Sequence, residues 1–179
     1  MIIVDNYIEE ERLLSKVNQD PFFNREEIHW WGSWWEREFI NLRQEVITHL
    51  FAKHKRFAST DVSGFKHWVK ECKEGIATSP VFEKDEECFK ETGNLSYPTI
   101  GSIYFHDPKA DEVEGGYLQL FDDQTTTSSY ELIKPKYNRL VIFDMSNLYA
   151  FQAPTKGSYN YMNISFWKNP IWRFETFLK

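Results

Sequence analysis

A series of short segments after Gly64 constrains the fold of this chain most strongly. In each segment residues of opposite character alternate, and β-branched and aromatic residues are frequent, as expected for β-strands. Turn-forming Asp-Pro, Gly-Gly and Asp-Asp pairs separate the segments. Six or more strands with no predicted helix between them indicate an antiparallel sandwich or barrel. The segments are "FKHWVKE", "TIGSIYF", "GGYLQLF", "SSYELIKP", "NRLVIFD" and "YNYMNISFW".

Two helices are predicted before these strands. Asp5 or Asn6 is expected to cap the first helix, after the apolar run Ile2 to Val4. The second is expected from Glu36 onward, because apolar residues recur there at helical spacing. The sequence therefore predicts an α+β, mainly β jelly roll. Residues 1–57 would form a helical layer on a β core of residues 64–169, within a single domain spanning 1–179.

The tryptophan-rich segment "WWGSWW" between the two predicted helices has two interpretations. It is either a loop that covers the core or a surface on which a ligand stacks. A carbohydrate-binding or virion-associated jelly roll would use it in the second way.

Composition excludes several classes of partner. The net charge of −6 and the lack of a long basic run argue against nucleic-acid binding. Cys72 and Cys88 form no C-x-x-C motif, and no apolar run approaches the length of a membrane span. We expect a cytoplasmic protein that binds neither nucleic acid nor membrane.

The order of several motifs resembles the iron(II)- and 2-oxoglutarate-dependent oxygenases. These motifs are "GFKHWV", "FEKDEE", "YPTIGSIYF", "EGGYLQLF", "IKPKYNRLVIFDMSNLY" and "APTKGSYNYMNISFW". The chain is most similar to the compact prolyl-4-hydroxylase-like group, which includes forms carried by marine bacteriophages. The resemblance implies a cupin-like double-stranded β-helix, and the host cytoplasm as location if a phage encodes the chain.

The residues that carry the chemistry of that family are replaced here. The family holds iron(II) with an H-x-D motif and a second histidine, and an Arg or Lys binds 2-oxoglutarate. By resemblance, the H-x-D positions fall on Val81 and Glu83, and the second histidine falls on Tyr149. The cation position falls on Tyr159. The spacing is retained, but both histidines and the cation are absent.

These replacements predict an oxygenase-like pseudoenzyme without metal or cofactor. It would bind an unknown protein, a small ligand or a second copy of itself in a remodelled aromatic pocket. The expected pocket residues, besides the replaced positions, are Phe82, Tyr104, Phe151, Tyr161 and His67.

An alternative retains the enzymatic function. In this hypothesis the chain is a dioxygenase that uses iron(II) and 2-oxoglutarate at an altered metal site. Glu83 would remain a ligand, and His67 or His106 would be recruited beside it. A lone histidine among apolar residues is also typical of a hydrogen-bonded core position, so this interpretation competes with a purely structural one.

Overall fold

The computed structural model describes residues 1–32, 34, 38–54 and 62–171. Within them the chain is mainly β and has three α-helices, α1 (Glu11–Gln19), α2 (Leu42–His54) and α3 (Glu86–Thr92). A 3₁₀ helix spans Pro108–Asp111. The strands are β1 (Ile2–Val4), β2 (His29–Gly32), β3 (Gly64–Cys72), β4 (Ile100–Phe105), β5 (Glu114–Gly115), β6 (Leu118–Phe121), β7 (Tyr130–Ile133), β8 (Arg139–Phe143), β9 (Tyr149–Phe151), β10 (Pro154–Lys156) and β11 (Tyr159–Trp167).

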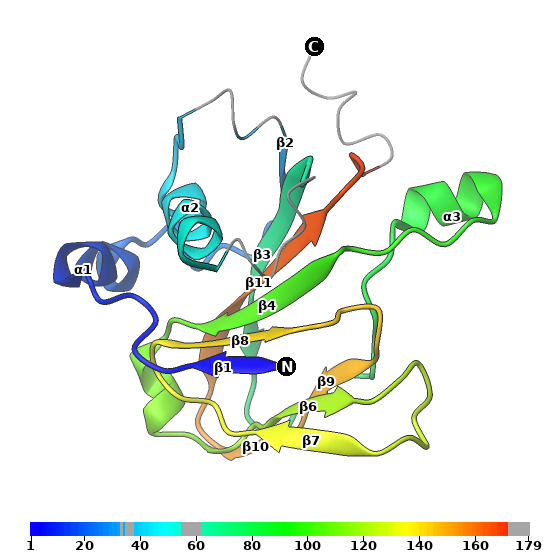
Figure 1. The fold of residues 1–179 in the computed structure, drawn as a ribbon. Coiled ribbons are helices and arrows are strands. Elements are labelled where there is room, and N and C mark those ends of the chain that lie inside the picture. The colour runs from blue at the N-terminus through cyan, green and yellow to red at the C-terminus, as the bar shows by residue number, and fades with distance from the viewer. Residues whose placement is uncertain (33, 35–37, 55–61, 172–179) are drawn as a thin grey trace.

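The strands form one large sheet and two small ones (Figure 1). The large sheet has six strands in the order β1-β8-β4-β11-β3-β2. A second sheet has the order β7-β6-β9, and β10 pairs with β5. All of these pairs are antiparallel.

The large sheet is buried on both faces, and this decides where a pocket can form. One core cluster joins α1 and α2 to one face of the sheet and contains Phe65, Tyr104 and Ile164. A second cluster fills the space between the large and small sheets and contains Cys72 and Tyr161. Because neighbouring residues of a strand point to opposite faces, each central strand contributes to both clusters.

All six predicted strands are present, as β3, β4, β6, β7, β8 and β11. The mainly β architecture with helices against one sheet agrees with the predicted jelly-roll class. The period-two alternation was informative because most of these strands pack an apolar face against the core. β7 is the exception, since Ile133 is its one buried residue.

The first helix begins later than predicted. Ile2 to Val4 form an edge strand beside β8, and α1 begins at Glu11. Asp5 instead forms an ion pair with Arg139, at 2.6 Å between Oδ1 and Nε. Asn6 takes a left-handed backbone conformation with φ of 51°. Neither residue can therefore cap α1, and the predicted cap was wrong.

The second helix also begins later than predicted, at Leu42. Asn41 Oδ1 accepts a hydrogen bond from the Gln44 backbone N–H at 3.0 Å. The Gln44 side chain in turn accepts one from the Ile40 N–H at 2.8 Å. This reciprocal arrangement resembles a capping box and sets the start of α2. Phe39 and Ile40 lie outside the helix and are exposed, and Glu36 is not among the described residues.

The sequence predicted helices in the N-terminal third alone, but the structure has a further helix, α3, among the strands. α3 begins within the segment "FEKDEE", where Asp85 accepts a hydrogen bond from the Cys88 N–H at 3.0 Å. Gly93, with φ of 72°, ends the helix in a left-handed conformation.

The tryptophan-rich segment begins as a strand rather than as a loop. Trp30 and Trp31 lie in β2, which pairs with β3 at the edge of the large sheet. Trp31 is buried, and Trp34 packs against the helix-side core. Ser33 and Trp35 are not among the described residues.

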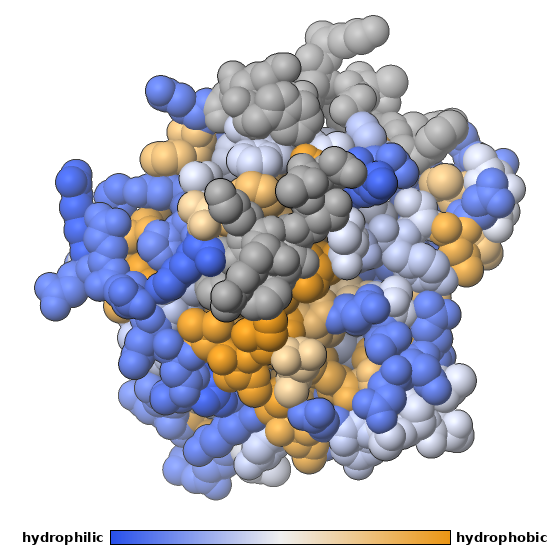
Figure 2. All heavy atoms as spheres, in the orientation of Figure 1, coloured by the Kyte–Doolittle hydropathy of each residue, from blue (hydrophilic) through white to orange (hydrophobic). Residues whose placement is uncertain are grey.

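The view in Figure 2 shows hydrophobic residues gathered over the edge strand β1, bordered by hydrophilic ones. Met1 and Ile3 are exposed there.

Among the described helices, none combines the length and apolar character needed to cross a membrane.

Candidate functional site

A pocket of about 520 Å³ opens between the large sheet and β9. Residues of β3 and β11 form one wall, and residues 76–83 with β9 form the other. This size lies within the range of roughly 300–1,000 Å³ that is typical of small-molecule sites. The lining residues are Glu26, Trp68, Lys70, Glu71, Cys72, Lys73, Ile76, Ala77, Thr78, Ser79, Val81, Glu83, Tyr149, Phe151, Tyr161 and Asn163.

The strand register explains which side chains reach this pocket. β3 and β11 pair so that Trp68 lies opposite Asn163 and Lys70 lies opposite Tyr161. Side chains in such pairs point to the same face of the sheet. The face that carries Lys66, Trp68 and Lys70 is therefore the inner one.

A hydrogen-bonded network closes the floor of the pocket. The Lys66 ammonium lies 3.0 Å from Glu83 Oε2, and both side chains are largely buried. The Tyr149 hydroxyl donates to Glu83 Oε1 at 3.1 Å. Asn163 Nδ2 donates to the Tyr149 hydroxyl at 3.0 Å. The carboxylate thus receives one ammonium and one phenol as partners.

The electrostatics of this floor keep Tyr149 neutral. Burial raises the pKa of the Tyr149 phenol well above its ordinary value, and the neighbouring Glu83 carboxylate raises this pKa further. A phenolate at this position would place a second negative charge beside Glu83 without solvent. Tyr149 therefore acts as a hydrogen-bond donor to the carboxylate.

Three of the positions singled out in the sequence meet at this floor. Val81 and Tyr149 pair across a β-bridge, with N···O distances of 2.9 and 2.8 Å. Glu83 follows two residues later, and its backbone N–H donates to the Met145 carbonyl at 2.9 Å. Val81, Glu83 and Tyr149 thus lie together although 66 residues separate the last two.

Tyr159 lies in the core beside the pocket rather than in its lining. Its hydroxyl donates to the Gly116 carbonyl at 2.5 Å, and burial raises its pKa above the ordinary value. Phe82 points away from the pocket and packs against Phe121, Leu148 and Ala150. Of the other predicted pocket residues, Phe151 and Tyr161 do line it, with their rings stacked at 4.1 Å.

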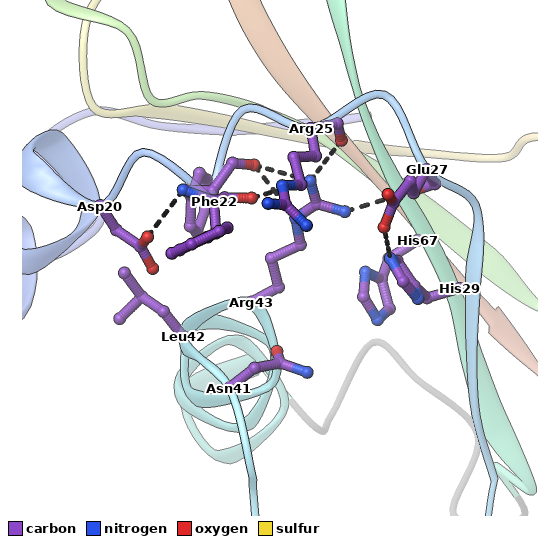
Figure 3. Close-up of a pocket in the computed structure, with 10 residues that line it drawn as sticks. Asp20, Phe22, Arg25, Glu27, His29, Asn41, Leu42, Arg43 and His67 are labelled. Atoms are coloured by element: carbon purple, nitrogen blue, oxygen red, sulfur yellow. Dashed lines mark hydrogen bonds and ion pairs between the residues drawn. The ribbon is translucent and has the colours of Figure 1, made fainter.

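His67, which the sequence placed in the pocket, lies on the opposite face of the large sheet. Its ring stacks on that of His29, with centroids 5.5 Å apart, and lines a separate cavity of about 160 Å³ beside Arg43 (Figure 3). Burial, aided by His29 and Arg43, lowers the pKa of His67 to about 3. The expectation failed because β3 turns its Lys66 face, not its His67 face, toward the small sheet.

Tyr104 and His106 also lie on the helix side of the sheet. The Tyr104 hydroxyl donates to Asn138 Oδ1 at 3.1 Å, so Tyr104 does not line the pocket. The His106 ring contacts Phe23, and its Nε2 lies 2.8 Å from Asn24 Oδ1. The large sheet separates Glu83 from both histidines, which rules out the alternative metal site built from these three residues.

The residues at the floor do not fit an iron(II) ion. Among the described residues, Glu83 supplies the one carboxylate at the floor, and the Lys66 ammonium already pairs with it. Tyr149 is a neutral phenol, and Val81 offers no lone pair. Nowhere in the described residues do three or more His, Cys, Asp or Glu side chains cluster in a way that could hold a metal.

Lys66 and Asn163 are the functional residues that sequence reasoning missed. Lys66 lies in "GFKHWV", on the strand face opposite that of His67, and His67 was the residue expected in the pocket. Tyr159, Tyr161 and Asn163 occupy every second position in "YNYMNISFW". This spacing indicates that the three side chains share one face of the strand.

Comparisons with known proteins show similarity at the level of structure. No family model matches the sequence, and no curated protein matches it. A prolyl-4-hydroxylase from Pseudomonas putida superposes with a TM-score of 0.58 at 10% identity, over 92% of this chain and 91% of that one.

Two further prolyl hydroxylases superpose over most of their length. The viral collagen prolyl hydroxylase of Paramecium bursaria Chlorella virus-1 has a TM-score of 0.53 at 15% identity, over 92% of this chain and 94% of that chain. The Trichoplax adhaerens enzyme, solved with a peptide of hypoxia inducible factor, has 0.54 at 12% identity, over 93% and 83%. At these identities the likeness shows the fold alone, and this chain therefore has the fold of the prolyl hydroxylases.

Proposed function

We propose that this chain is a catalytically inactive relative of the 2-oxoglutarate oxygenases that binds a small ligand in its remodelled pocket. Its strands would form the double-stranded β-helix of that family. The observation that carries the proposal is the Lys66–Glu83 ion pair at the pocket floor. The Lys66 ammonium supplies the positive charge that a metal ion would otherwise provide beside the Glu83 carboxylate.

The convergence of the replaced positions supports this reading. Val81, Glu83 and Tyr149 were assigned to the iron-ligand positions from the resemblance to the family, and they adjoin one another in three dimensions. A chance alignment would not bring them together at the floor of one pocket. The residues at these positions now form hydrogen bonds and apolar contacts in place of metal bonds.

The position expected to bind the distal carboxylate of 2-oxoglutarate has also changed in chemistry. Tyr159 carries no positive charge, and its hydroxyl already donates to the Gly116 carbonyl. A dicarboxylate would find no buried unpaired cation at the floor, because Lys66 is engaged by Glu83. Loss of the metal ligands and loss of the cosubstrate cation thus coincide.

Metal and turnover measurements test the proposal. Protein purified with added iron(II) is expected to hold far less than one equivalent of iron by mass spectrometry. Incubation with 2-oxoglutarate and oxygen is expected to yield no succinate by NMR. One bound equivalent of iron together with succinate formation would overturn the proposal.

A rebuilt variant provides the matched control. Val81→His, Glu83→Asp and Tyr149→His restore the three ligand types, and Lys66→Ala removes the competing ammonium. This variant is expected to bind cobalt(II), visible by its absorption spectrum, whereas the same variant that keeps Lys66 is expected to bind it more weakly. Equal binding by both would show that Lys66 does not compete with a metal.

A further inference from the structure

One polar atom at the pocket floor has no hydrogen-bond partner among the described residues. It is Oδ1 of Asn163, a residue whose exposed fraction is only 1%. Leaving a buried acceptor unsatisfied is unfavourable, and native proteins pair such atoms with protein, water or a ligand. Asn163 is one of the residues that line the pocket, so this unpaired acceptor adjoins the pocket.

The network fixes the orientation of the Asn163 amide. An ionised carboxylate only accepts hydrogen bonds, so the Tyr149 hydroxyl must donate its proton to Glu83. The Tyr149 oxygen can then only accept, and it accepts from Asn163 Nδ2. Asn163 Oδ1 consequently takes no part in the network and remains an unused acceptor.

Aromatic side chains form part of the pocket wall. Phe151 and Tyr161 stack with ring centroids 4.1 Å apart, and Trp68 lies opposite Asn163 on the neighbouring strand. Flat aromatic molecules pack well against such side chains. The pocket volume of about 520 Å³ accommodates a ring with substituents.

The charges around the pocket balance. At the floor, Lys66 and Glu83 neutralise each other. The remaining charged lining residues are two of each sign: Glu26, Glu71, Lys70 and Lys73. The pocket therefore has no excess charge that would select an ion, and it favours an uncharged ligand.

From these features we propose that the pocket binds an uncharged planar aromatic molecule with an N–H donor, such as an aromatic amide. The N–H donates to Asn163 Oδ1, in place of any water there, while the ring packs against Phe151 and Tyr161. This inference rests on the proposed binding function and specifies the chemical class of its ligand.

Three probes of nearly equal shape separate the contributions. They are 4-fluorobenzamide, which is uncharged and has a donor, its methyl ester analogue methyl 4-fluorobenzoate, which is uncharged without a donor, and 4-fluorobenzoate, which is charged. Fluorine NMR titration of the metal-free protein gives a Kd for each. We expect the amide to bind about fivefold more tightly than the ester, as one net hydrogen bond predicts, and the carboxylate to bind most weakly.

Variants assign the difference to Asn163. In Asn163→Leu the amide and ester are expected to bind equally, and retained ester binding shows that the pocket is still formed. Asn160→Leu is the matched control, because Asn160 lies on the opposite face of β11 and bonds to Asp107. It is expected to keep the fivefold preference.

Several outcomes would overturn the inference. Equal binding of amide and ester by the unaltered protein would show that Asn163 does not recognise the N–H donor of the ligand. Tightest binding of the carboxylate would show that the pocket prefers an anion. If no probe bound, the pocket would not be a site for this class of ligand. Each of these results leaves the iron and succinate measurements unchanged, so failure of this inference is distinguishable from failure of the proposed function.

Discussion

At the scale of single residues, the Lys66–Glu83 pair is the most consequential feature. Breaking a buried ion pair from one side leaves an uncompensated charge. Lys66→Met is therefore expected to lower the free energy of unfolding by about 3 kcal/mol. In the double variant with Glu83→Gln no charge is left, and the new amide oxygen can still accept from Tyr149, so most of the loss should be recovered. Urea denaturation measures both.

The control for this prediction is Lys70→Met on the same face of β3. Lys70 is exposed, so its substitution is expected to change stability by no more than about 0.5 kcal/mol. If the double variant were as unstable as Lys66→Met alone, the uncompensated charge would not be the cause.

At the scale of elements, Asn138 joins the chain before α1 to β4 and β8. Its side chain accepts from the Ile8 N–H and donates to the Ile8 carbonyl, both at 3.0 Å. It also accepts from the Tyr104 hydroxyl at 3.1 Å. In addition, its φ of 56° lies in the left-handed region, which asparagine tolerates better than most residues.

Two substitutions separate these contributions. Asn138→Ala loses the three hydrogen bonds and strains the backbone, so the free energy of unfolding is expected to fall by about 4 kcal/mol. Asn138→Gly loses the same bonds without that strain, and should be about 1 kcal/mol more stable than the alanine variant. Thermal or urea unfolding compares the pair, and equal stabilities would show that the backbone conformation carries no cost.

At the scale of the whole molecule, two buried histidines make stability depend on pH. Burial is the main cause that lowers the pKa of His67 to about 3 and that of His106 to about 4. In the unfolded chain both would titrate near their ordinary value of 6.5. Below that value the unfolded state binds protons that the folded state does not, so acid favours unfolding.

The expected stability is constant with respect to these groups above pH 6.5 and falls as the pH drops toward 4. Each histidine contributes up to about 1.4 kcal/mol per pH unit in this window. His67→Leu should lower the slope by up to about 1.4 kcal/mol per pH unit, as measured by urea unfolding at several pH values. Asp5, whose pKa is lowered to about 2 chiefly by its hydrogen bond with Arg139, acts below this window. An unchanged slope in the variant would contradict the burial of a neutral His67.

Sequence alone determined the strands. Alternation placed the strands correctly because it reflects which residues share a face. The resemblance assigned the family's two histidine positions to Val81 and Tyr149, and these residues do lie side by side. Helix starts were misplaced because their caps depend on side-chain contacts, such as that between Asn41 and Gln44, which apolar periodicity does not encode.

Only the tertiary structure decided which face of β3 is the inner one. Helices cover one face of the large sheet and a second sheet covers the other, so apolar residues occur on both. Alternation groups Lys66 with Trp68 and His67 with Val69, but it cannot say which group meets the pocket. Packing places Lys66 on the pocket side, beside Glu83, and His67 on the helix side, beside His29. The floor of the pocket therefore contains an ion pair.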